Sequence, residues 1–328
     1  MNISRRTFIT NIAIAGVSLA LPPIVYGATP KPKLTVGFLQ GANSVAITLL
    51  GRFMPNYQVS YRSFSDISTI TAALTENDIQ VAQNIYTAFL GMVSKGLPVS
   101  AVSGQCNGGS DLVVRKDLLI PPGSWQDLKK VITEYKAKGK HFRIASFFGS
   151  VQDIELRLLL EKMGITVNAD VHLINVPYPG MSQAMASGAA EAAAPVQPFG
   201  VEMELSGLAS HFVYPYDQPA GDLTNLVLMA DPYISSSPAV FKDVGTGMIA
   251  LTEYLKTTEG QHLWGQVVAK YSNVSSKAID LTLEQLTPSY TLPIQKMLSM
   301  GDAMAKYGFL DKPISKEQLL QHIHYAPA

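Results

Sequence analysis

Short apolar, β-branched runs alternate with helical patterns along much of this 328-residue chain. Such β-α-β-α order predicts a mostly parallel sheet with helices on both faces, and thus the α/β class. In the first part of the chain, strands are predicted at 34–39, 57–64, 80–83, 99–104 and 111–115. Helices are predicted between them at 44–53, 66–75 and 86–94.

The alternation restarts after Pro121-Pro122-Gly123, which predicts a second α/β lobe. Strands are expected there at 142–147, 171–176 and 191–195, with helices at 125–135, 151–163, 180–187 and 199–206. Two more strands are expected at 212–214 and 224–229, and from Pro238 to about His324 the pattern is helical. We expect lobe I to comprise 28–115 and 212–328, with a C-terminal helical tail, and lobe II to comprise 116–211. Crossings near Lys116 and at 211–214 would form a hinge.

The first 27 residues have the pattern of an export signal. The charged start Ser4-Arg5-Arg6-Thr7-Phe8-Ile9 is followed by an apolar run at 12–21 and by small residues near Gly27. Paired arginines followed by this Phe are the twin-arginine form of the signal. The run is too short to span a bilayer, and a buried N-terminal helix is the alternative. We predict a twin-arginine signal peptide over 1–27 and a periplasmic protein.

The composition argues against several classes of protein. Lys and Arg together number 25, as do Asp and Glu, so nothing indicates a nucleic-acid partner. The six histidines show no metal-ligand spacing, and no later segment could span a membrane without charge or Pro. The single cysteine, Cys106, excludes a disulfide within the chain and is more typical of a small buried residue than of a nucleophile. We therefore expect no enzyme, no cofactor and no metal site.

Four stretches of the chain form an ordered set of motifs. They are 78–82 with the helix end Lys95-Gly96-Leu97-Pro98-Val99, the segment 108–117, the turn Phe147-Phe148-Gly149-Ser150, and Met185-Ala186-Ser187-Gly188 with 192–199. Their order and spacing resemble the nitrate/sulfonate/taurine-type solute-binding proteins of ABC importers, a group that also includes pyrimidine-precursor binders.

The resemblance implies a two-lobed fold of the type II periplasmic-binding-protein kind and a solute-binding subunit, monomeric, that hands its solute to importer permease subunits. The sequence departs from the family pattern at three places. The loop after the first predicted helix is short, at Met54-Pro55-Asn56; Gln197 replaces the usual Glu; and Asp66 stands where small polar residues are typical. These departures leave the solute open among sulfonates, taurine-like amines and pyrimidine-like rings.

In open α/β sheets a ligand lies beyond the carboxyl ends of the strands, where helices begin. Two lobes that face each other would enclose a solute in a cleft. The residues expected to contact it in lobe I are Gln40, Gly41, Ser65, Asp66, Gln83 and Asn84. Those expected in lobe II are Phe148, Gly149, Ser150, Gln152, Tyr178, Gln197 and Phe199, and the hinge would add Asn107 and Tyr214.

The chemistry of these residues favours a polar organic molecule with an apolar or flat part, since amides both donate and accept. Free N–H groups at Gly149 and Ser150 would favour an acceptor atom, although Ser150 could simply cap its own helix. Asp66 could stabilise a helix N-terminus or meet an N–H group of the solute. Two other functions stay open: a periplasmic sensor subunit for a signalling receptor, and a twin-arginine-exported enzyme with a cofactor.

Overall fold

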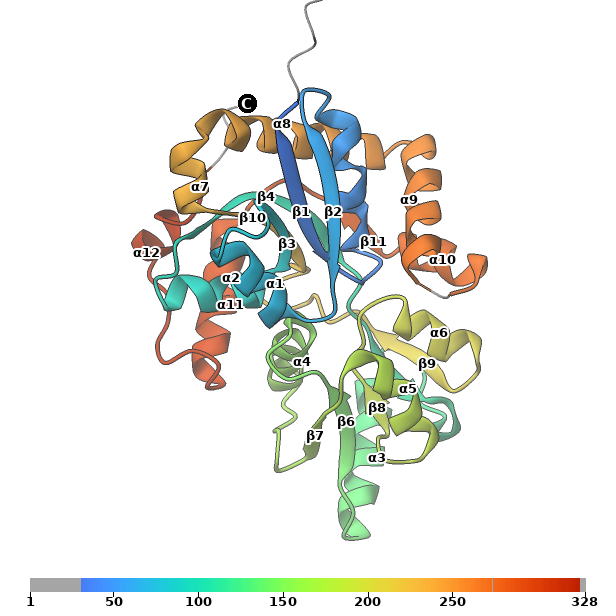
Figure 1. Cartoon of the computed structure of the whole chain (residues 1–328). Coiled ribbons are helices and arrows are strands. Elements are labelled where there is room, and N and C mark those ends of the chain that lie inside the picture. The colour runs from blue at the N-terminus through green and yellow to red at the C-terminus, as the bar shows by residue number, and fades with distance from the viewer. Residues whose placement is uncertain (1–30, 273, 325–328) are drawn as a thin grey trace, which may run out of the picture. The chain divides into compact units, whose positions relative to one another are not determined.

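The structure, a computed structural model, describes residues 31–272 and 274–324. The signal peptide predicted for 1–27 lies outside these residues. From residue 32 onward the described chain builds two β-sheets, each covered by helices (Figure 1). The α/β class expected from the alternating pattern is thereby confirmed.

The first sheet has six strands in the order β11-β4-β10-β3-β1-β2. Their bounds are β1 (Lys33–Leu39), β2 (Gln58–Phe64), β3 (Val81–Ile85), β4 (Val99–Gly108), β10 (Asn225–Ala230) and β11 (Leu286–Pro288). Strand β1 pairs in parallel with β2 and β3, whereas β10 is antiparallel to β3 and β4. Strand β11 lies within the tail predicted as helical; it pairs antiparallel with β4 for only three residues, too short to show a strand pattern in the sequence.

The second sheet has five strands in the order β7-β6-β8-β5-β9. Their bounds are β5 (Leu112–Arg115), β6 (Phe142–Ser146), β7 (Val171–Asn175), β8 (Ala192–Ala193) and β9 (Ala209–Val213). Strand β6 is parallel to β7 and β8, and β5 is antiparallel to β8 and β9. Both sheets are thus mixed rather than mostly parallel, because in each the strand that arrives directly from the other sheet runs against its neighbours.

The chain crosses between the sheets earlier than Lys116, the position expected from the sequence. Strand β5 was expected to end lobe I, but its pairing with β8 and β9 places it in the second sheet. The crossing is therefore the turn at 108–111, where Gly108 and Gly109 have φ of +82° and +79°, which favour glycine. The return segment lies beside this turn, since Gly108 N donates to Asp222 O at 2.8 Å and Ser110 N donates to the Tyr216 hydroxyl at 2.8 Å.

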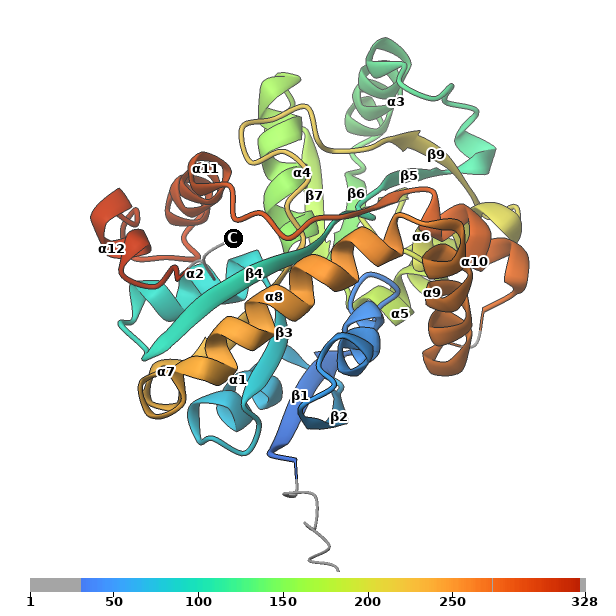
Figure 2. The same ribbon diagram turned by 90° about the horizontal axis from the view of Figure 1, so that it is seen from above.

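Helices cover both faces of the first sheet. Those built on it are η1 (Val45–Phe53), α1 (Ile67–Thr75), α2 (Tyr86–Ser94), α7 (Asp231–Ser236), α8 (Pro238–Leu255), α9 (Thr258–Tyr271), α10 (Ser276–Leu283), α11 (Ile294–Lys306) and α12 (Lys316–Leu320). One apolar core lies under α1, α2 and α11, and another lies under η1, α8 and α9. Figure 2 shows α8 running alongside β4 on the latter face.

Helices also cover the second sheet: η2 (Lys116–Leu118), α3 (Trp125–Ala137), α4 (Val151–Lys162), α5 (Tyr178–Ala186) and α6 (Phe199–Leu205). Two smaller cores fill its faces. Helix α4 reaches the first sheet's helices as well. Its Val151 and Ile154 belong to the core that contains Met300 of α11, and Glu161 accepts a hydrogen bond from Lys306 at 2.5 Å.

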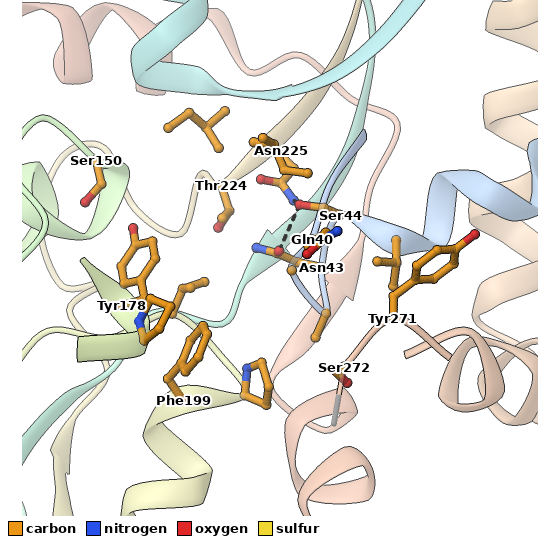
Figure 3. Close-up of a pocket in the computed structure, with 18 of the residues that line it drawn as sticks. Gln40, Asn43, Ser44, Ser150, Tyr178, Phe199, Thr224, Asn225, Tyr271 and Ser272 are labelled. Atoms are coloured by element: carbon orange, nitrogen blue, oxygen red, sulfur yellow. Dashed lines mark hydrogen bonds between the residues drawn. The ribbon is translucent and has the colours of Figure 1, made fainter. Parts of the chain in front are cut away.

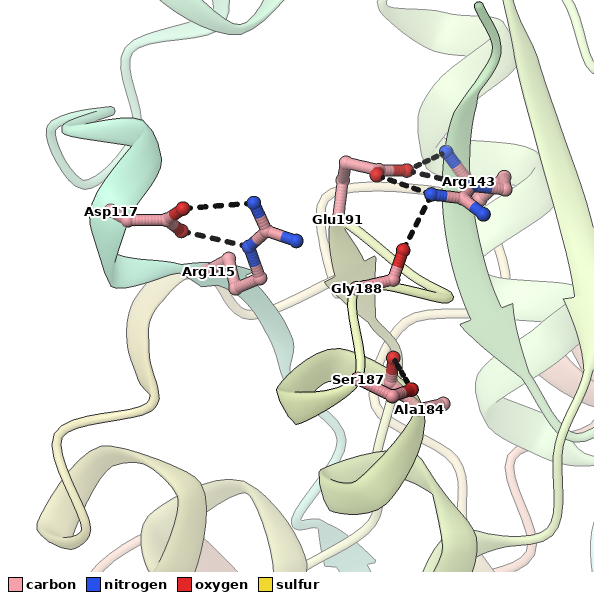
Figure 4. Close-up of polar contacts among 7 residues, drawn as sticks. All are labelled: Arg115, Asp117, Arg143, Ala184, Ser187, Gly188 and Glu191. Carbon is pink, nitrogen blue, oxygen red and sulfur yellow. Dashed lines mark hydrogen bonds and ion pairs between the residues drawn. The ribbon is translucent and has the colours of Figure 1, made fainter.

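An ion pair between Arg143 and the buried carboxylate of Glu191 holds β6 to the turn before β8 (Figure 4). The Arg143 guanidinium donates to both Glu191 oxygens, at 2.7 and 3.1 Å, and to the Gly188 carbonyl at 2.7 Å. The backbone N–H of Arg143 also donates to Glu191, at 2.7 Å. The motif around Gly188 noted in the sequence is therefore structural in this chain.

Neither membrane nor metal signatures occur in the part of the chain that the structure describes. No helix there is both long and apolar enough to cross a membrane. No three His, Cys, Asp or Glu side chains come close enough there to hold a metal ion.

Candidate functional site

A cavity of about 930 Å³ lies where the two sheets face each other, and both contribute to its walls (Figure 3). Its volume is at the upper end of the range for small-molecule sites. From the first sheet and its helices it is lined by residues 39–45 and 65–68, and by Ile85, Thr224, Asn225, Val268, Tyr271, Ser272 and Val274. From the second it is lined by Phe147, Ser150, Gln152, Tyr178, Pro179, Val196, Pro198, Phe199 and Glu202.

Eight of the residues predicted from strand ends meet at this cavity. They are Gln40, Gly41, Ser65, Asp66, Ser150, Gln152, Tyr178 and Phe199. They come from turns that follow β1 and β2 in one sheet and β6 in the other, and from the starts of α5 and α6. The rule that places a site at the carboxyl ends of parallel strands therefore located the cavity.

Gln83 and Asn84 were expected in the site but do not line it. Both are fully buried in β3. Gln83 Oε1 accepts from Leu39 N at 3.0 Å, and Asn84 Nδ2 donates to Thr71 Oγ1 at 3.4 Å. Asn84 Oδ1 accepts from Ile85 N at 2.9 Å. Their amides brace β3 against β1 and α1, so they support the wall of the cavity from behind.

Gln197 and Asn107 also lie outside the lining. Gln197 is fully buried, its Oε1 accepts from Val201 N at 2.9 Å, and its Nε2 donates to Gln285 Oε1 at 2.7 Å. Asn107 lies on β4, where its partner is Thr287 of β11. Gln197 therefore links α6 to the segment before β11, and the exchange of the family's Glu for Gln does not alter the cavity wall.

Phe148 and Tyr214 do not line the cavity, and each is 39% exposed. The Arg157 guanidinium lies over the Phe148 ring, 5.2 Å from its centre. The Tyr214 ring packs on His211 with 4.4 Å between centres. Both aromatic rings thus pack against residues outside the cavity lining, Arg157 and His211.

The N-terminus of α4 is occupied by the protein's own carboxylate. Gly149, which does not line the cavity, donates its N–H to Asp153 Oδ2 at 3.1 Å, and Ser150 Oγ accepts from Asp153 N at 3.2 Å. Ser146 donates to the other Asp153 oxygen at 2.9 Å. The capping role weighed for Ser150 is therefore present, and the Gly149 N–H is not free for a solute.

Asp66 caps α1. Its Oδ1 accepts from Thr69 N at 2.8 Å and from the Ser68 hydroxyl at 2.6 Å. These hydrogen bonds hold the pKa of the Asp66 carboxyl at about 2, so it carries a negative charge at neutral pH. Asp66 thus stabilises the N-terminus of α1, which was one of the two roles expected for it. Asp66 also forms part of the cavity wall.

A polar group on the first-sheet side of the cavity was not predicted from the sequence. Asn225 Nδ2 donates to Ser44 Oγ at 3.2 Å, and Ser44 donates to Asn43 Oδ1 at 3.3 Å. Asn43 and Ser44 lie just beyond Gln40 and Gly41 in the same turn, so extending that motif would have found them. Asn225 begins β10, and because β10 is antiparallel its amino end lies at the edge where parallel strands end. A rule based on carboxyl ends alone overlooks it.

Aromatic rings form the second-sheet wall (Figure 3). The Tyr178 and Phe199 rings are nearly parallel, at 17°, with centres 6.2 Å apart, and Phe147 packs edge-on against Tyr178 at 5.4 Å. The Tyr178 hydroxyl donates to Gln152 Oε1 at 2.5 Å, and Gln152 Nε2 donates to Ser110 Oγ at 2.9 Å. Burial raises the pKa of Tyr178, so its hydroxyl stays uncharged.

Solved structures of binding proteins share the fold of this chain. The periplasmic aliphatic sulphonate-binding protein SsuA from Escherichia coli superposes with a TM-score of 0.71 at 17% identity, covering 90% of this chain and 98% of its own. The periplasmic nitrate-binding protein NrtA from Synechocystis PCC 6803 superposes with a TM-score of 0.74 at 15% identity, covering 90% of this chain and 86% of its own. The chain therefore has the two-lobed periplasmic-binding-protein fold, as expected from the resemblance.

The sequence itself places the chain in a family. The model of the NMT1-like family matches residues 27–214, more than half of the chain, and the protein belongs to that family. None of the curated proteins matches the chain. Family and structural neighbours together confirm the resemblance to nitrate- and sulfonate-type binding proteins.

Proposed function

We propose that this protein is the periplasmic solute-binding subunit of an ABC importer and that it holds a small organic solute in the cavity between its sheets. The observation that carries the proposal is that this cavity is lined from both sheets, at the edge where β1, β2 and β6 end. The only backbone crossings between the sheets within the described residues are the turn at 108–111 and the return segment after β9. Hinged closure about two such crossings would bury a solute.

Three features support the remaining parts of the proposal. The twin-arginine pattern at 1–27 supports export to the periplasm. The NMT1-like family and the importer-type neighbours support delivery to permease subunits. The cavity wall combines amides and hydroxyls on one side with aromatic rings on the other, which suits an organic solute better than a bare ion. We further propose that the protein binds its solute as a monomer.

A thermal-shift screen of the chain from residue 28 onward tests the proposal. A compound present at one hundred times its Kd should add about 2.7 kcal/mol to the free energy of unfolding. Calorimetric titration of the best compound should give one site per chain. Phe199→Ala, in the cavity wall, should weaken binding at least tenfold. Phe148→Ala, the control on the protein surface, should change Kd less than twofold, and equal Kd values for both variants would refute the site.

A further inference from the structure

The charges on the cavity wall are all of one sign. Asp66 and Glu202 are its charged residues, and no Lys, Arg or His lines it within residues 31–272 and 274–324. Glu202 lies in the first turn of α6, and its carboxylate has no ion-pair partner in the described structure. Partial burial raises the pKa of Glu202. An oxyanion in this cavity would meet carboxylates with no cation to offset them.

Helix N-termini bind anions through free N–H groups. Two of the helix N-termini at the cavity, those of α1 and α4, are capped by the protein's own side chains. At α1 the side chain of Asp66 accepts the Thr69 N–H, and at α4 Ser150 and Asp153 accept the N–H groups of Asp153 and Gly149. At these two helix ends the carboxylates of Asp66 and Asp153 thus accept N–H groups that an oxyanion could otherwise use.

Asn225 points to the opposite kind of ligand. It is 1% exposed and lines the cavity, and its Oδ1 has no hydrogen-bond partner among the described residues. The Ser44 hydroxyl gives its single hydrogen to Asn43, so it must accept from Asn225, which fixes the nitrogen of that amide toward Ser44 and the oxygen away from it (Figure 3). A buried acceptor without a donor is costly, and a solute N–H would satisfy it.

Resting on the proposed function, we propose that the cavity binds nitrogen-containing solutes that donate hydrogen bonds and carry no net negative charge, and that it rejects sulfonates and nitrate. The solute N–H groups meet Asn225 Oδ1 and the Glu202 carboxylate. The faces of Tyr178 and Phe199 contact its flat or cationic part, since aromatic faces attract both. In this respect the chain differs from the sulfonate- and nitrate-binding proteins that share its fold.

Calorimetric titration of two groups of probes at equal ionic strength tests the proposal. The first group holds primary amines, guanidines and aminopyrimidines; the second holds ethanesulfonate, butanesulfonate, MOPS and nitrate. The tightest Kd in the first group should be at least tenfold lower than any in the second. A sulfonate or nitrate that binds more tightly than every nitrogen compound would overturn the proposal and leave the solute-binding function intact. Binding by neither group at millimolar concentration would contradict both.

Matched variants show which groups choose the solute. Asn225→Ala should raise the Kd of the tightest nitrogen compound at least tenfold, whereas Asn107→Ala, outside the lining, should change it less than twofold. Glu202→Gln should narrow the ratio of amine to sulfonate affinity at least threefold. Glu204→Gln, on the same helix and outside the lining, should leave that ratio unchanged. A ratio equally insensitive to both Glu variants would contradict the role given to Glu202.

Discussion

The indole nitrogen of Trp264 donates a hydrogen bond to the carbonyl oxygen of Ala42 at 3.0 Å, across 222 positions of sequence. Trp264 is fully buried on α9, and Ala42 lies in the turn after β1 that forms part of the cavity wall. This hydrogen bond from α9, in the helical tail, therefore stabilises the turn after β1.

Trp264→Phe should lower the free energy of unfolding by about 1–3 kcal/mol, because it leaves a buried carbonyl without its donor. It should also weaken solute binding, since the turn at 40–44 loses its support. Urea unfolding and calorimetric titration check the two effects. Trp125→Phe is the control: Trp125 packs edge-on against Phe212 in a core of the second sheet and does not line the cavity, so solute affinity should be unchanged.

Glu155 should make the protein less stable as pH rises. Burial, and to a smaller extent the nearby Asp222, raises the pKa of the Glu155 carboxyl well above its ordinary value, while Ser110 opposes the shift. Between the unfolded and folded pKa values the folded state keeps a proton that the unfolded state releases. This residue therefore costs about 1.4 kcal/mol of stability per pH unit over that window.

Glu155→Gln should remove this cost, so its stability relative to the parent protein should grow as pH rises above about 4.5. Urea unfolding at pH 4.5, 6 and 7.5 measures the difference. Glu161→Gln is a control of opposite sign. The hydrogen bond from Lys306 lowers the pKa of Glu161, so the stability that Glu161 contributes is complete above the unfolded pKa and is lost as pH falls. A stability gain for Glu155→Gln that does not vary with pH would contradict the explanation.

Glu191→Ala should destabilise the protein by about 2–4 kcal/mol, because it removes three hydrogen bonds to Arg143 around a buried carboxylate. The pair of Arg115 with Asp117, whose carboxylate is exposed, offers a comparison within the same lobe, where Asp117→Ala should cost less than 1 kcal/mol. Thermal unfolding of the two variants distinguishes these values. Equal losses would show that burial of the Glu191 carboxylate does not strengthen its contribution to stability.

Cys106 should not react with thiol reagents in the folded protein. It is fully buried on β4, and burial raises the pKa of its thiol. The expectation that this cysteine is a small core residue predicts no labelling by Ellman's reagent in buffer. In 6 M guanidinium chloride, where the chain is unfolded, one thiol per chain should react. Fast labelling of the native protein would indicate an accessible, activated cysteine instead.

Local sequence patterns predicted the elements closely wherever packing agrees with propensity. Residues 34–39 were expected as a strand and form β1 at Lys33–Leu39, and the helix expected at 199–206 is α6 at Phe199–Leu205. Strand β11 escaped prediction because three residues carry no periodicity. The antiparallel direction of β5 and β10 also had no local signal, since it follows from the sheet each strand joins after the crossing.

The site could be predicted only in part for the same reason. Strand ends pointed to Gln40, Asp66 and Tyr178, which line the cavity. They could not show whether a polar side chain faces the cavity or a neighbouring strand, and Gln83 faces Leu39. Residues from distant segments, such as Asn225, reach the cavity through sheet order, which single-sequence patterns do not contain.

A crystal structure of the protein grown with the tightest compound from the screen would show where the solute binds. We expect one solute molecule between the two sheets, in contact with Asn225 on one side and with Tyr178 and Phe199 on the other. A solute seated outside this cavity, or touching residues of one sheet alone, would contradict it.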